Sequence, residues 1–500
     1  MPNTSRNHNS DNPNTFSLNP EKFYKEPKKI NMSKTVVQNV LFYDHNWSHI
    51  ARLVQKFANL ALESGIHVIL LSDKKPSQIN GNLEILNIYD VPQKKTLVNL
   101  QKELRYSLNK ALITERAFYD YSSFRQSQRY SRLSEEQIAK NVMPYVNALD
   151  YVIRERADLI IDWCPDNFLS SVAQMIAANY KKPCTVFLPH YWWKDGALII
   201  DRMDLTSTVI DKNYDLFYRN PDLLDKEHLA NIFSKKQTLF YFKQSKMYKL
   251  RDRLQLIINR QKSYQPVSFR NWIVRRTSTA LSSALIRACI PSLEQVPQDE
   301  PFVIYPLHIS PEAAILGTSP ELADQFGLIK NISMNLPYGV KLYIKQHPCE
   351  HLGLGLDYDF YRRLITLPNV RIFNKKANLD NMLDHPSFLA IVILTGTAAI
   401  DAALKRKPVF MFGRSYFSVA DCFMKPSSFH EFFTQLSLVM HGKFRFNDRA
   451  LNAIIGALDK SVVRADIDLL AYDNPTDMAS QLPFIWLSYV ESRKQMGSRA

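Results

Sequence analysis

Five short apolar runs, separated by amphipathic stretches, dominate the chain between Pro301 and Gly413. Each run is bounded by polar or turn-forming residues, as buried parallel strands usually are. The runs are Pro301–Leu307, Lys341–His347, Asn369–Asn374, Leu389–Thr395 and Pro408–Gly413. The stretches between them have helical spacing: Pro320–Leu336, Tyr358–Leu367, Leu379–Leu383 and Thr397–Arg406. This alternation predicts a doubly wound parallel sheet, whose ligands bind beyond the carboxyl ends of the strands.

A similar alternation occurs earlier in the chain. VVQNVLFYDH predicts a strand, Ser48–Glu63 an amphipathic helix with Ser48 as its N-cap, and HVILLSD the next strand. A long helical region, Lys95–Arg156, follows. The segments DLIIDWC, NFLSSVAQMIAANY and PCTVFLP then predict a strand, a helix and a strand. We therefore expect an α/β protein with two Rossmann-like domains facing a cleft, the arrangement known as GT-B.

Pattern and composition divide the chain into five parts. Residues 1–33 are rich in Asn, Ser, Pro and Lys, and we expect them to be disordered. Residues 34–210 form the first Rossmann-like domain, and 211–299 a helical, basic insertion ending in a linker. Residues 300–460 form the second Rossmann-like domain. We expect helices in residues 461–500 to cross back and brace the first domain.

Composition limits the class of protein. Five hundred residues with 46% hydrophobic content are enough to bury two cores. No apolar run approaches the length of a membrane-spanning helix. The cysteines lack CxxC spacing, so we expect reduced thiols, a cytoplasmic protein and no zinc site. They are Cys164, Cys184, Cys289, Cys349 and Cys422.

The net charge of +15 is concentrated in one segment. Lys235–Arg276 contains twelve Lys or Arg residues against one acid, Asp252, and so carries +11. A basic amphipathic helix of this kind binds an anionic membrane surface. Binding to nucleic acid or an acidic glycan and a simply solvated helical face are the alternatives. Trp272 beside Arg275 and Arg276 favours the membrane surface.

The segment LYIKQHP carries the first candidate site residues. Side chains alternate along a strand, so Lys345 and His347 are expected to leave the same face. Together they suit a diphosphate, to which both donate charge-assisted hydrogen bonds. The alternative is a surface lysine beside a structural histidine. Placement at the end of an interior strand favours phosphate binding.

The segment LTGTAAID predicts a turn between a strand and a helix. Gly396 permits the tight turn after Thr395, and Thr397 is the expected N-cap. Free backbone N–H groups and the positive end of the helix dipole suit an anion. Asp401 lies one turn further along the helix and is suited to ribose hydroxyls. Its alternative role is to balance Lys405.

The remaining candidates follow other strands. In YPLHISPEAA, His308 and Glu312 are candidate acid, base or phosphate-binding groups, although a histidine in a capping turn is equally often structural. Arg414 follows the last predicted strand and is a candidate phosphate ligand.

In the first domain, several polar side chains follow predicted strands and suit acceptor binding or catalysis, or merely cap turns. They are Asp44, His45, His49, Asp162, Asp166, His190, Trp192, Lys194 and Asp195.

The motifs of the second domain, read in order, resemble those of bacterial capsule and surface-polysaccharide biosynthesis proteins, a group that includes Kdo-transferase-like enzymes. The resemblance runs from YPLHISPEA through LYIKQHP to LTGTAAIDAALKRKPVFMFG and RSYF. It implies that Lys345, His347 and Thr395-Gly396-Thr397 bind the nucleotide of an activated sugar. Family members usually carry Glu where this chain has Asp401, and commonly Gly where Ala399 stands.

The resemblance implies a glycosyltransferase that uses a nucleotide-activated sugar as substrate, with no further cofactor. No DxD pair is evident between the domains, so we expect no metal. The expected partners are the donor, a glycan or lipid-linked acceptor and an anionic inner membrane surface, rather than nucleic acid. The alternatives are a nucleotide-sugar epimerase, a polyol-phosphate transferase, or a non-catalytic basic protein that binds glycan or nucleic acid.

Overall fold

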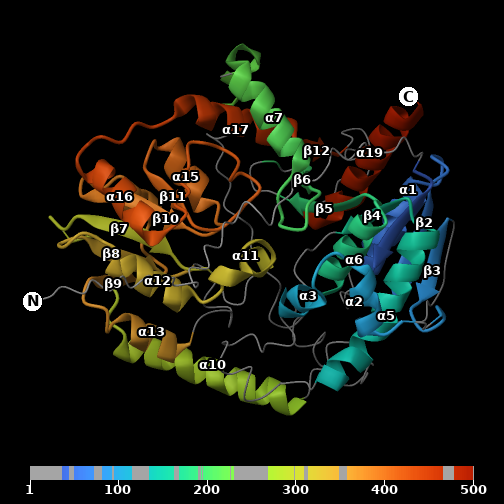
Figure 1. Cartoon of the computed structure of the whole chain (residues 1–500), viewed down its shortest axis with the longest axis horizontal. Helices are drawn as coiled ribbons and strands as arrows, with labels where there is room; N and C mark the ends of the chain where they lie inside the picture. Colours follow the sequence, from blue (N-terminus) through green and yellow to red (C-terminus); the bar gives the residue numbers. More distant parts are fainter. Residues whose placement is uncertain are drawn as a thin grey trace, which may run out of the picture.

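A computed structural model shows two α/β domains, each built on its own sheet (Figure 1). The structure describes residues 37–43, 50–72, 82–92, 95–114, 135–162, 168–189, 193, 195–225, 227–229, 269–297, 299–308, 313–347, 357–465 and 478–498. The two sheets have seven and five strands within these ranges. The expected α/β class with two Rossmann-like domains is therefore confirmed.

The first sheet has the order β12-β6-β5-β4-β1-β2-β3. Its first five strands in the chain run parallel, whereas β6 is antiparallel to β5 and β12 is antiparallel to β6. The strands are β1 (Asn39–Tyr43), β2 (His67–Ser72), β3 (Leu83–Asn87), β4 (Leu159–Asp162), β5 (Cys184–Pro189), β6 (Gly196–Ile200) and β12 (Val462–Arg464).

Alternation along these strands creates two cores, one on each face of the first sheet. Leu41 and Tyr43 lie in the core covered by α5 and α6, and Val40 and Phe42 in the core covered by α1 and α19. The helices of this domain are α1 (Ile50–Leu60), α2 (Leu97–Glu103), α3 (Leu108–Thr114), α5 (Glu135–Glu155), α6 (Phe168–Asn179) and α19 (Met478–Ser498).

The second sheet has the order β11-β10-β7-β8-β9, with all neighbours parallel. This is the Rossmann order, in which the chain starts in the centre and winds outward in both directions. The strands are β7 (Phe302–Pro306), β8 (Lys341–Lys345), β9 (Val370–Phe373), β10 (Phe388–Ile393) and β11 (Val409–Met411).

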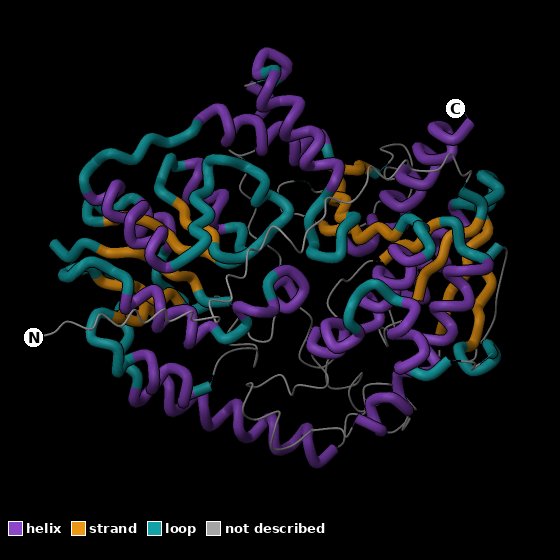
Figure 2. Tube along the Cα trace, in the orientation of Figure 1, coloured by secondary structure: helices purple, strands orange, loops and turns teal. Residues whose placement is uncertain are grey.

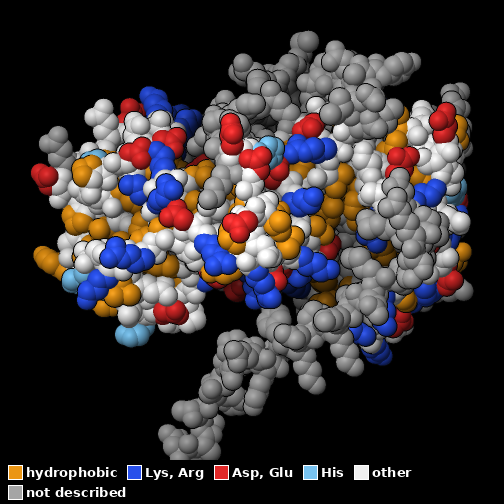
Figure 3. All heavy atoms as spheres, turned by 90° about the horizontal axis from the view of Figure 1, so that it is seen from above, with side chains coloured by type: hydrophobic (Ala, Val, Ile, Leu, Met, Phe, Trp, Pro, Cys, Tyr) orange, Lys and Arg blue, Asp and Glu red, His pale blue; other side chains and the backbone are white. Residues whose placement is uncertain are grey.

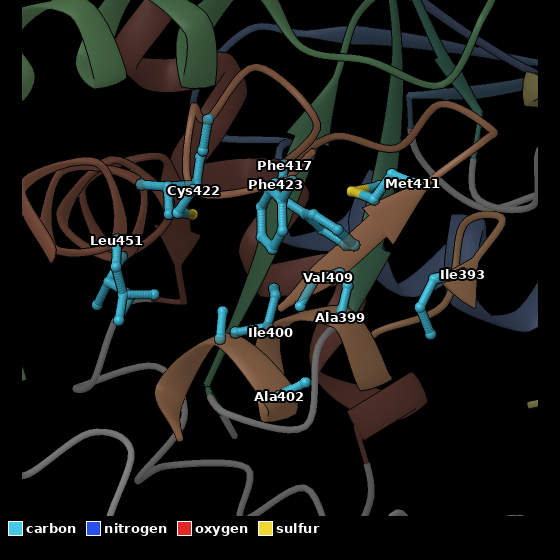
Figure 4. Close-up of a cluster of buried hydrophobic side chains, with 14 of the residues drawn as sticks. Ile393, Ala399, Ile400, Ala402, Val409, Met411, Phe417, Cys422, Phe423 and Leu451 are labelled. Carbon is cyan, nitrogen blue, oxygen red and sulfur yellow. The ribbon is translucent and has the colours of Figure 1, made fainter. Parts of the chain in front are cut away.

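Helices cover both faces of the second sheet (Figure 2). One core includes residues of α12, α13 and α16, and the other residues of α14, α15 and α17. In the second core, Ile400 and Ala402 of α15 lie near Val409 of β11 and Leu451 of α17 (Figure 4). The helices are α11 (Ala313–Thr318), α12 (Gln325–Met334), α13 (Tyr358–Leu364), α14 (Leu379–Leu383), α15 (Ala398–Leu404), α16 (Phe429–Met440) and α17 (Asp448–Lys460).

Two helices join the domains at the top of Figure 1. α7 (Thr208–Arg219) follows the first domain and packs along α17 of the second. A Cβ added to Gly456 of α17 would overlap the end of the Leu224 side chain and contact the Phe217 ring, so a larger residue there would make the leucine side chain shift. The core that contains these helices also includes Leu198 of β6 and Ile304 of β7, so it is continuous across the two domains.

The chain returns to the first domain after α17. β12 adds to the edge of the first sheet, and α19 packs on α1. Trp486 of α19 is fully buried, with its ring centroid 4.9 Å from that of Phe42 and 6.1 Å from that of Phe57.

Several local expectations differ from the structure. β3, β6 and β12 are strands that the apolar pattern did not predict. β3 and β12 are the partly exposed edge strands of the first sheet, whereas β6 is buried and lies between β12 and β5. The helix expected at Pro320–Leu336 is a 3₁₀ turn, Pro320–Leu322, followed by α12. Within Lys95–Arg156 the described residues form three separate helices, α2, α3 and α5.

The basic segment falls mostly outside the described residues. Only α10 (Phe269–Cys289) overlaps it, and Tyr358 donates its backbone N–H to the Ser282 hydroxyl of α10 at 2.8 Å. The segment carries +11 of the net +15, which leaves +4 for the rest of the chain. Accordingly, Lys and Arg side chains are interspersed with Asp and Glu over the described surface in Figure 3.

Candidate functional site

Four neighbouring strands of the second sheet end on candidate residues. β11, β10, β7 and β8 are consecutive in the sheet, so their carboxyl ends lie about 5 Å apart from strand to strand. Lys345 ends β8, His308 follows β7, Thr395 follows β10 and Gly413 follows β11. Leu307 donates its N–H to the Lys345 carbonyl at 2.9 Å, which holds the ends of β7 and β8 in register.

Lys345 is the buried cation of this strand edge. Only 7% of the residue is exposed, and burial lowers the pKa of its amine. Among the described residues its ammonium donates only to the Gln346 carbonyl, at 3.4 Å, and forms no ion pair with a carboxylate. A buried ammonium without a counter-ion is costly, so the position favours an anionic ligand.

His347 lies two residues beyond Lys345 and is half-buried. β8 ends at Lys345, although Gln346 still donates its N–H to the Phe373 carbonyl of β9 at 2.9 Å. Lys345 is therefore the last residue of the strand, and His347 lies beyond it. The shared face predicted for the two side chains depends on the alternation continuing past the end of β8. His347 stays a candidate phosphate ligand.

His308 lies against Gly396. A Cβ built on Gly396 would lie 3.4 Å from Cε1 and 3.8 Å from Nε2 of the His308 ring. The backbone of Gly396 does not have a positive φ, so a left-handed conformation does not explain the glycine at this turn. A Cβ there would make an ordinary contact with the imidazole, and its absence leaves room beside the ring.

The hydroxyl of Thr395 is buried and has no hydrogen-bond partner among the residues that the structure describes. Thr395 is 8% exposed and directly precedes the Gly396 turn. An unpaired buried hydroxyl costs free energy, and a ligand oxygen at this position would satisfy it.

Thr397 occupies the N-cap position of α15, but its side chain makes no capping hydrogen bond. Its backbone is already helical, with φ −63° and ψ −14°, whereas a capping threonine normally has an extended backbone. The capping role predicted for Thr397 is therefore wrong.

Asp401 lies in α15 and is half-buried. Lys405, its proposed alternative partner, forms ion pairs with Asp384 at 2.5 Å and Asp380 at 3.8 Å.

Arg414 connects the strand edge to the first domain. Its guanidinium donates to Asp204 at 3.4 Å, and its backbone N–H donates to the Ser319 hydroxyl at 3.0 Å. Leu205, beside Asp204, has a positive φ of 55° and lies 2.9 Å from where a Cβ on Gly317 would be. The carboxyl ends of the second sheet therefore face the loop that follows β6.

Two residues of this edge were not identified from the sequence. Ser319 accepts the N–H of Arg414 and leaves no room for a side chain at Gly413, whose Cβ would lie 2.9 Å from the serine Oγ. Gln325, 2% exposed, pairs with both backbone groups of His308. Neither residue had a role assigned from the sequence, and the fold shows the contacts that each one makes.

The catalytic candidates Glu312, Asp44 and His45 lie outside the described residues. So do His49, Asp166, His190, Trp192 and Lys194.

Two candidate residues of the first domain are paired with other side chains of the protein. Asp162 is 1% exposed and accepts a hydrogen bond from Ser170, while burial and Asp162 together raise the pKa of Tyr43. Asp195 forms an ion pair with Arg464 of β12 at 3.1 Å.

Trp193, between the candidates Trp192 and Lys194, joins the domains. Its ring is 3% exposed, and its Nε1–H donates to Asp459 of α17 at 2.9 Å. Arg464 also bonds to Asp459, at 2.9 Å. Part of the segment predicted to stack on sugars therefore packs at the joint between the domains.

Within the described ranges, no cluster of His, Cys, Asp and Glu has the composition of a metal site. No helix in those ranges is both long and apolar enough to span a bilayer.

Comparison with known proteins finds one family. Residues 217–423 match the family of capsule polysaccharide biosynthesis proteins, which confirms the resemblance predicted from the motifs. No curated protein matches the chain.

Solved structures give weaker similarities. The β-Kdo 2,4-transferase of Thermosulfurimonas dismutans KpsC is 12% identical over 61% of this chain and 80% of its own, with a TM-score of 0.31. The β-Kdo 2,7-transferase of the same KpsC is 12% identical over 77% and 97%, with a TM-score of 0.32. UDP-GlcNAc 2-epimerase of Neisseria meningitidis is 10% identical over 85% and 98%, with a TM-score of 0.23. TM-scores this low do not establish a common fold, so the fold assignment rests on the two strand orders.

Proposed function

We propose that this chain, whose residues 217–423 match the capsule polysaccharide biosynthesis family, is a glycosyltransferase that uses a nucleotide-activated sugar. The observation that carries the proposal is the buried ammonium of Lys345, without a carboxylate partner in the described chain, at the carboxyl end of a Rossmann sheet. Parallel sheets of this order bind nucleotides at that edge. The unpaired hydroxyl of Thr395, on the same edge, adds a second group suited to phosphate.

The proposed role of this edge is to stabilise the leaving group. When the sugar is transferred, the bond between its anomeric carbon and the donor phosphate breaks, and negative charge grows on the phosphate. Lys345, His347 and Arg414 are the cationic or donor groups that oppose this charge. The Gly396 turn allows the phosphate to approach the backbone, and Asp401 accepts hydrogen bonds from the ribose.

The acceptor hydroxyl must lose a proton in the same reaction. His308 is the described candidate for an acid or base, because its ring lies at the Gly396 turn. Glu312, Asp44 and His45 are the other candidates. No metal or further cofactor is needed in this scheme, since the protein itself supplies the positive charge.

We propose a glycan or lipid-linked acceptor and a cytoplasmic location at the inner membrane face. The support is the charge of +11 in Lys235–Arg276, interleaved with aromatic and aliphatic residues.

A thermal-shift screen tests the donor proposal. The purified protein is heated with CMP-, UDP-, GDP- and dTDP-sugars, and a ligand of the folded state raises the melting temperature. Product formed from the hit only when an acceptor glycan is present supports a transferase. Conversion of the sugar without acceptor would instead identify an epimerase. Salt-sensitive RNA binding with no nucleotide-sugar hit would contradict both activities.

A further inference from the structure

Gln325 makes an unusual connection to the candidate site. It is the first residue of α12, is 2% exposed and lies seventeen residues after His308. Its Oε1 accepts the backbone N–H of His308 at 3.0 Å, and its Nε2 donates to the His308 carbonyl at 3.1 Å. Oε1 also accepts the hydroxyl of Tyr305 at 3.4 Å.

This pairing resembles one rung of a β-ladder. The side-chain amide offers one acceptor and one donor in the plane of a peptide, so it satisfies both backbone groups of His308 where β7 has ended. The bonds are buried and therefore costly to break. They fix the backbone of His308, whose ring lies against Gly396.

We infer that Gln325 is a positioning residue, which holds His308 at the Gly396 turn so that its imidazole meets the ligand phosphate. The inference rests on the proposed function, since it takes the Gly396 turn to be the phosphate site. Gln325 itself touches the ligand at no point in this scheme.

A purely structural amide is the competing explanation. Gln325 also accepts the hydroxyl of the buried Tyr305, and its loss would lower stability whether or not His308 acts. The test must therefore follow His308 and ligand binding separately from stability.

Gln325→Glu and Gln325→Met provide that test. A protonated glutamate accepts the His308 N–H and donates to the His308 carbonyl, as the amide does, whereas an ionised one cannot donate. Burial disfavours the ionised form, so the pairing is retained at low pH and lost as the pH rises. Methionine has a similar size and pairs with neither group at any pH.

The first readout is the affinity for inorganic pyrophosphate, measured by calorimetry at pH 5.5 and 8.5 and divided by that of the unchanged protein at the same pH. We expect Gln325→Glu to bind nearly as well at pH 5.5 and about tenfold more weakly at pH 8.5. Gln325→Met should bind about tenfold more weakly at both. If only the glutamate variant weakens, its charge repels the ligand and the inference is overturned.

The second readout needs no ligand. Diethyl pyrocarbonate modifies accessible imidazoles, and mass spectrometry of the His308 peptide reports its rate. His308 is 8% exposed, so we expect slow modification that Gln325→Met accelerates several-fold. An unchanged rate together with unchanged pyrophosphate affinity would show that the amide does not position His308.

Asn369 offers a matched control. Its Nδ2 donates to the Ser333 carbonyl at 2.9 Å, and its Oδ1 accepts the Ser333 hydroxyl at 2.5 Å, at the opposite end of the same sheet. Asn369→Asp and Asn369→Leu should lower the melting temperature without changing pyrophosphate affinity or His308 modification. If the unchanged protein binds neither pyrophosphate nor any nucleotide sugar, the proposed function fails, while the modification rate still decides the role of Gln325.

Discussion

At the scale of single residues, the candidate site consists of polar groups that the fold buries without pairing them fully. Lys345 has no carboxylate partner among the described residues, and the hydroxyl of Thr395 has no hydrogen-bond partner. Both conditions lower the stability of the empty protein. Groups of this kind mark functional sites, because a ligand supplies the interactions that the protein lacks.

Lys345→Met is expected to separate binding from stability. The variant should weaken pyrophosphate binding by about 1.5–3 kcal/mol, the usual value for a hydrogen bond to a charged group. Its free energy of unfolding at pH 7 should equal or exceed that of the unchanged protein, because a buried unpaired charge is removed. Calorimetry and urea denaturation measure the two quantities. A variant that binds normally but is strongly destabilised would make Lys345 a structural residue.

Lys345 is also expected to make the free energy of unfolding depend on pH. Burial lowers the pKa of Lys345 from its ordinary value of 10.5. Between the lowered pKa and 10.5 the unfolded chain binds more protons than the folded one, so the free energy of unfolding rises with pH. Below this window the cost of burying the charge is fully present. Lys345→Met should remove this rise, which urea denaturation at a series of pH values would detect.

Gly396 and Gly413 should tolerate substitution differently. A Cβ on Gly396 would make an ordinary contact of 3.4 Å with the His308 ring, so Gly396→Ala should fold and retain activity, whereas Gly396→Val should displace the ring and abolish turnover. A Cβ on Gly413 would lie 2.8 Å from the Leu394 carbonyl oxygen, so even Gly413→Ala should lower the melting temperature. Full activity in Gly396→Val would remove this turn from the site.

At the scale of elements, α19 stabilises a domain that lies far from it in the sequence. It covers one face of the first sheet, where Trp486 lies between Phe42 and Phe57. The hydrophobic core on that face is therefore complete only after the last helix has packed.

Trp486→Ala should remove about 3–5 kcal/mol from the free energy of unfolding, as large aromatic deletions in cores do. Urea denaturation measures it, and Phe433→Ala is the control, because Phe433 of α16 is 41% exposed and should cost far less. If Trp486→Ala lowers the free energy of unfolding as little as Phe433→Ala does, α19 is not part of the core in solution.

At the scale of the whole molecule, several contacts among the described residues join the two domains. α7 packs on α17, β12 and α19 return to the first domain, and Trp193 donates to Asp459 of α17. Arg414 also pairs with Asp204 beside the candidate site. This last contact is an exposed ion pair, which contributes little stability but links the site to the first domain.

If the basic segment Lys235–Arg276 binds a membrane, it holds the whole molecule at the membrane surface. Changing Lys243, Lys246, Lys249, Arg251 and Arg253 to Gln should move the protein from anionic vesicles into the supernatant in a sedimentation assay. Each basic residue near such a surface contributes about 1 kcal/mol, and high salt should release the unchanged protein because the charges are screened. Absence of sedimentation with anionic vesicles at low salt would leave the segment as a solvated surface.

Much of the fold follows from local pattern. The five strands of the second sheet and their order of appearance were predictable, because buried parallel strands are continuous apolar runs with clear boundaries. The edge strands β3 and β12 were not, since partly exposed strands lack that signal, and β6 was missed although all five of its residues are buried. The motifs also predicted the resemblance to capsule polysaccharide biosynthesis proteins, which the match at residues 217–423 confirms.

The sequence by itself determined which residues end the strands, because alternation and chain order place His308, Lys345 and Thr395 at the carboxyl edge. Only the tertiary structure decided which of their groups are paired. Gln325 meets His308, Ser319 meets Arg414, and Trp193 meets Asp459 through contacts between residues distant in the chain. Such contacts depend on how helices dock on sheets, and a pattern of polar and apolar positions specifies the docking face but not the individual partners.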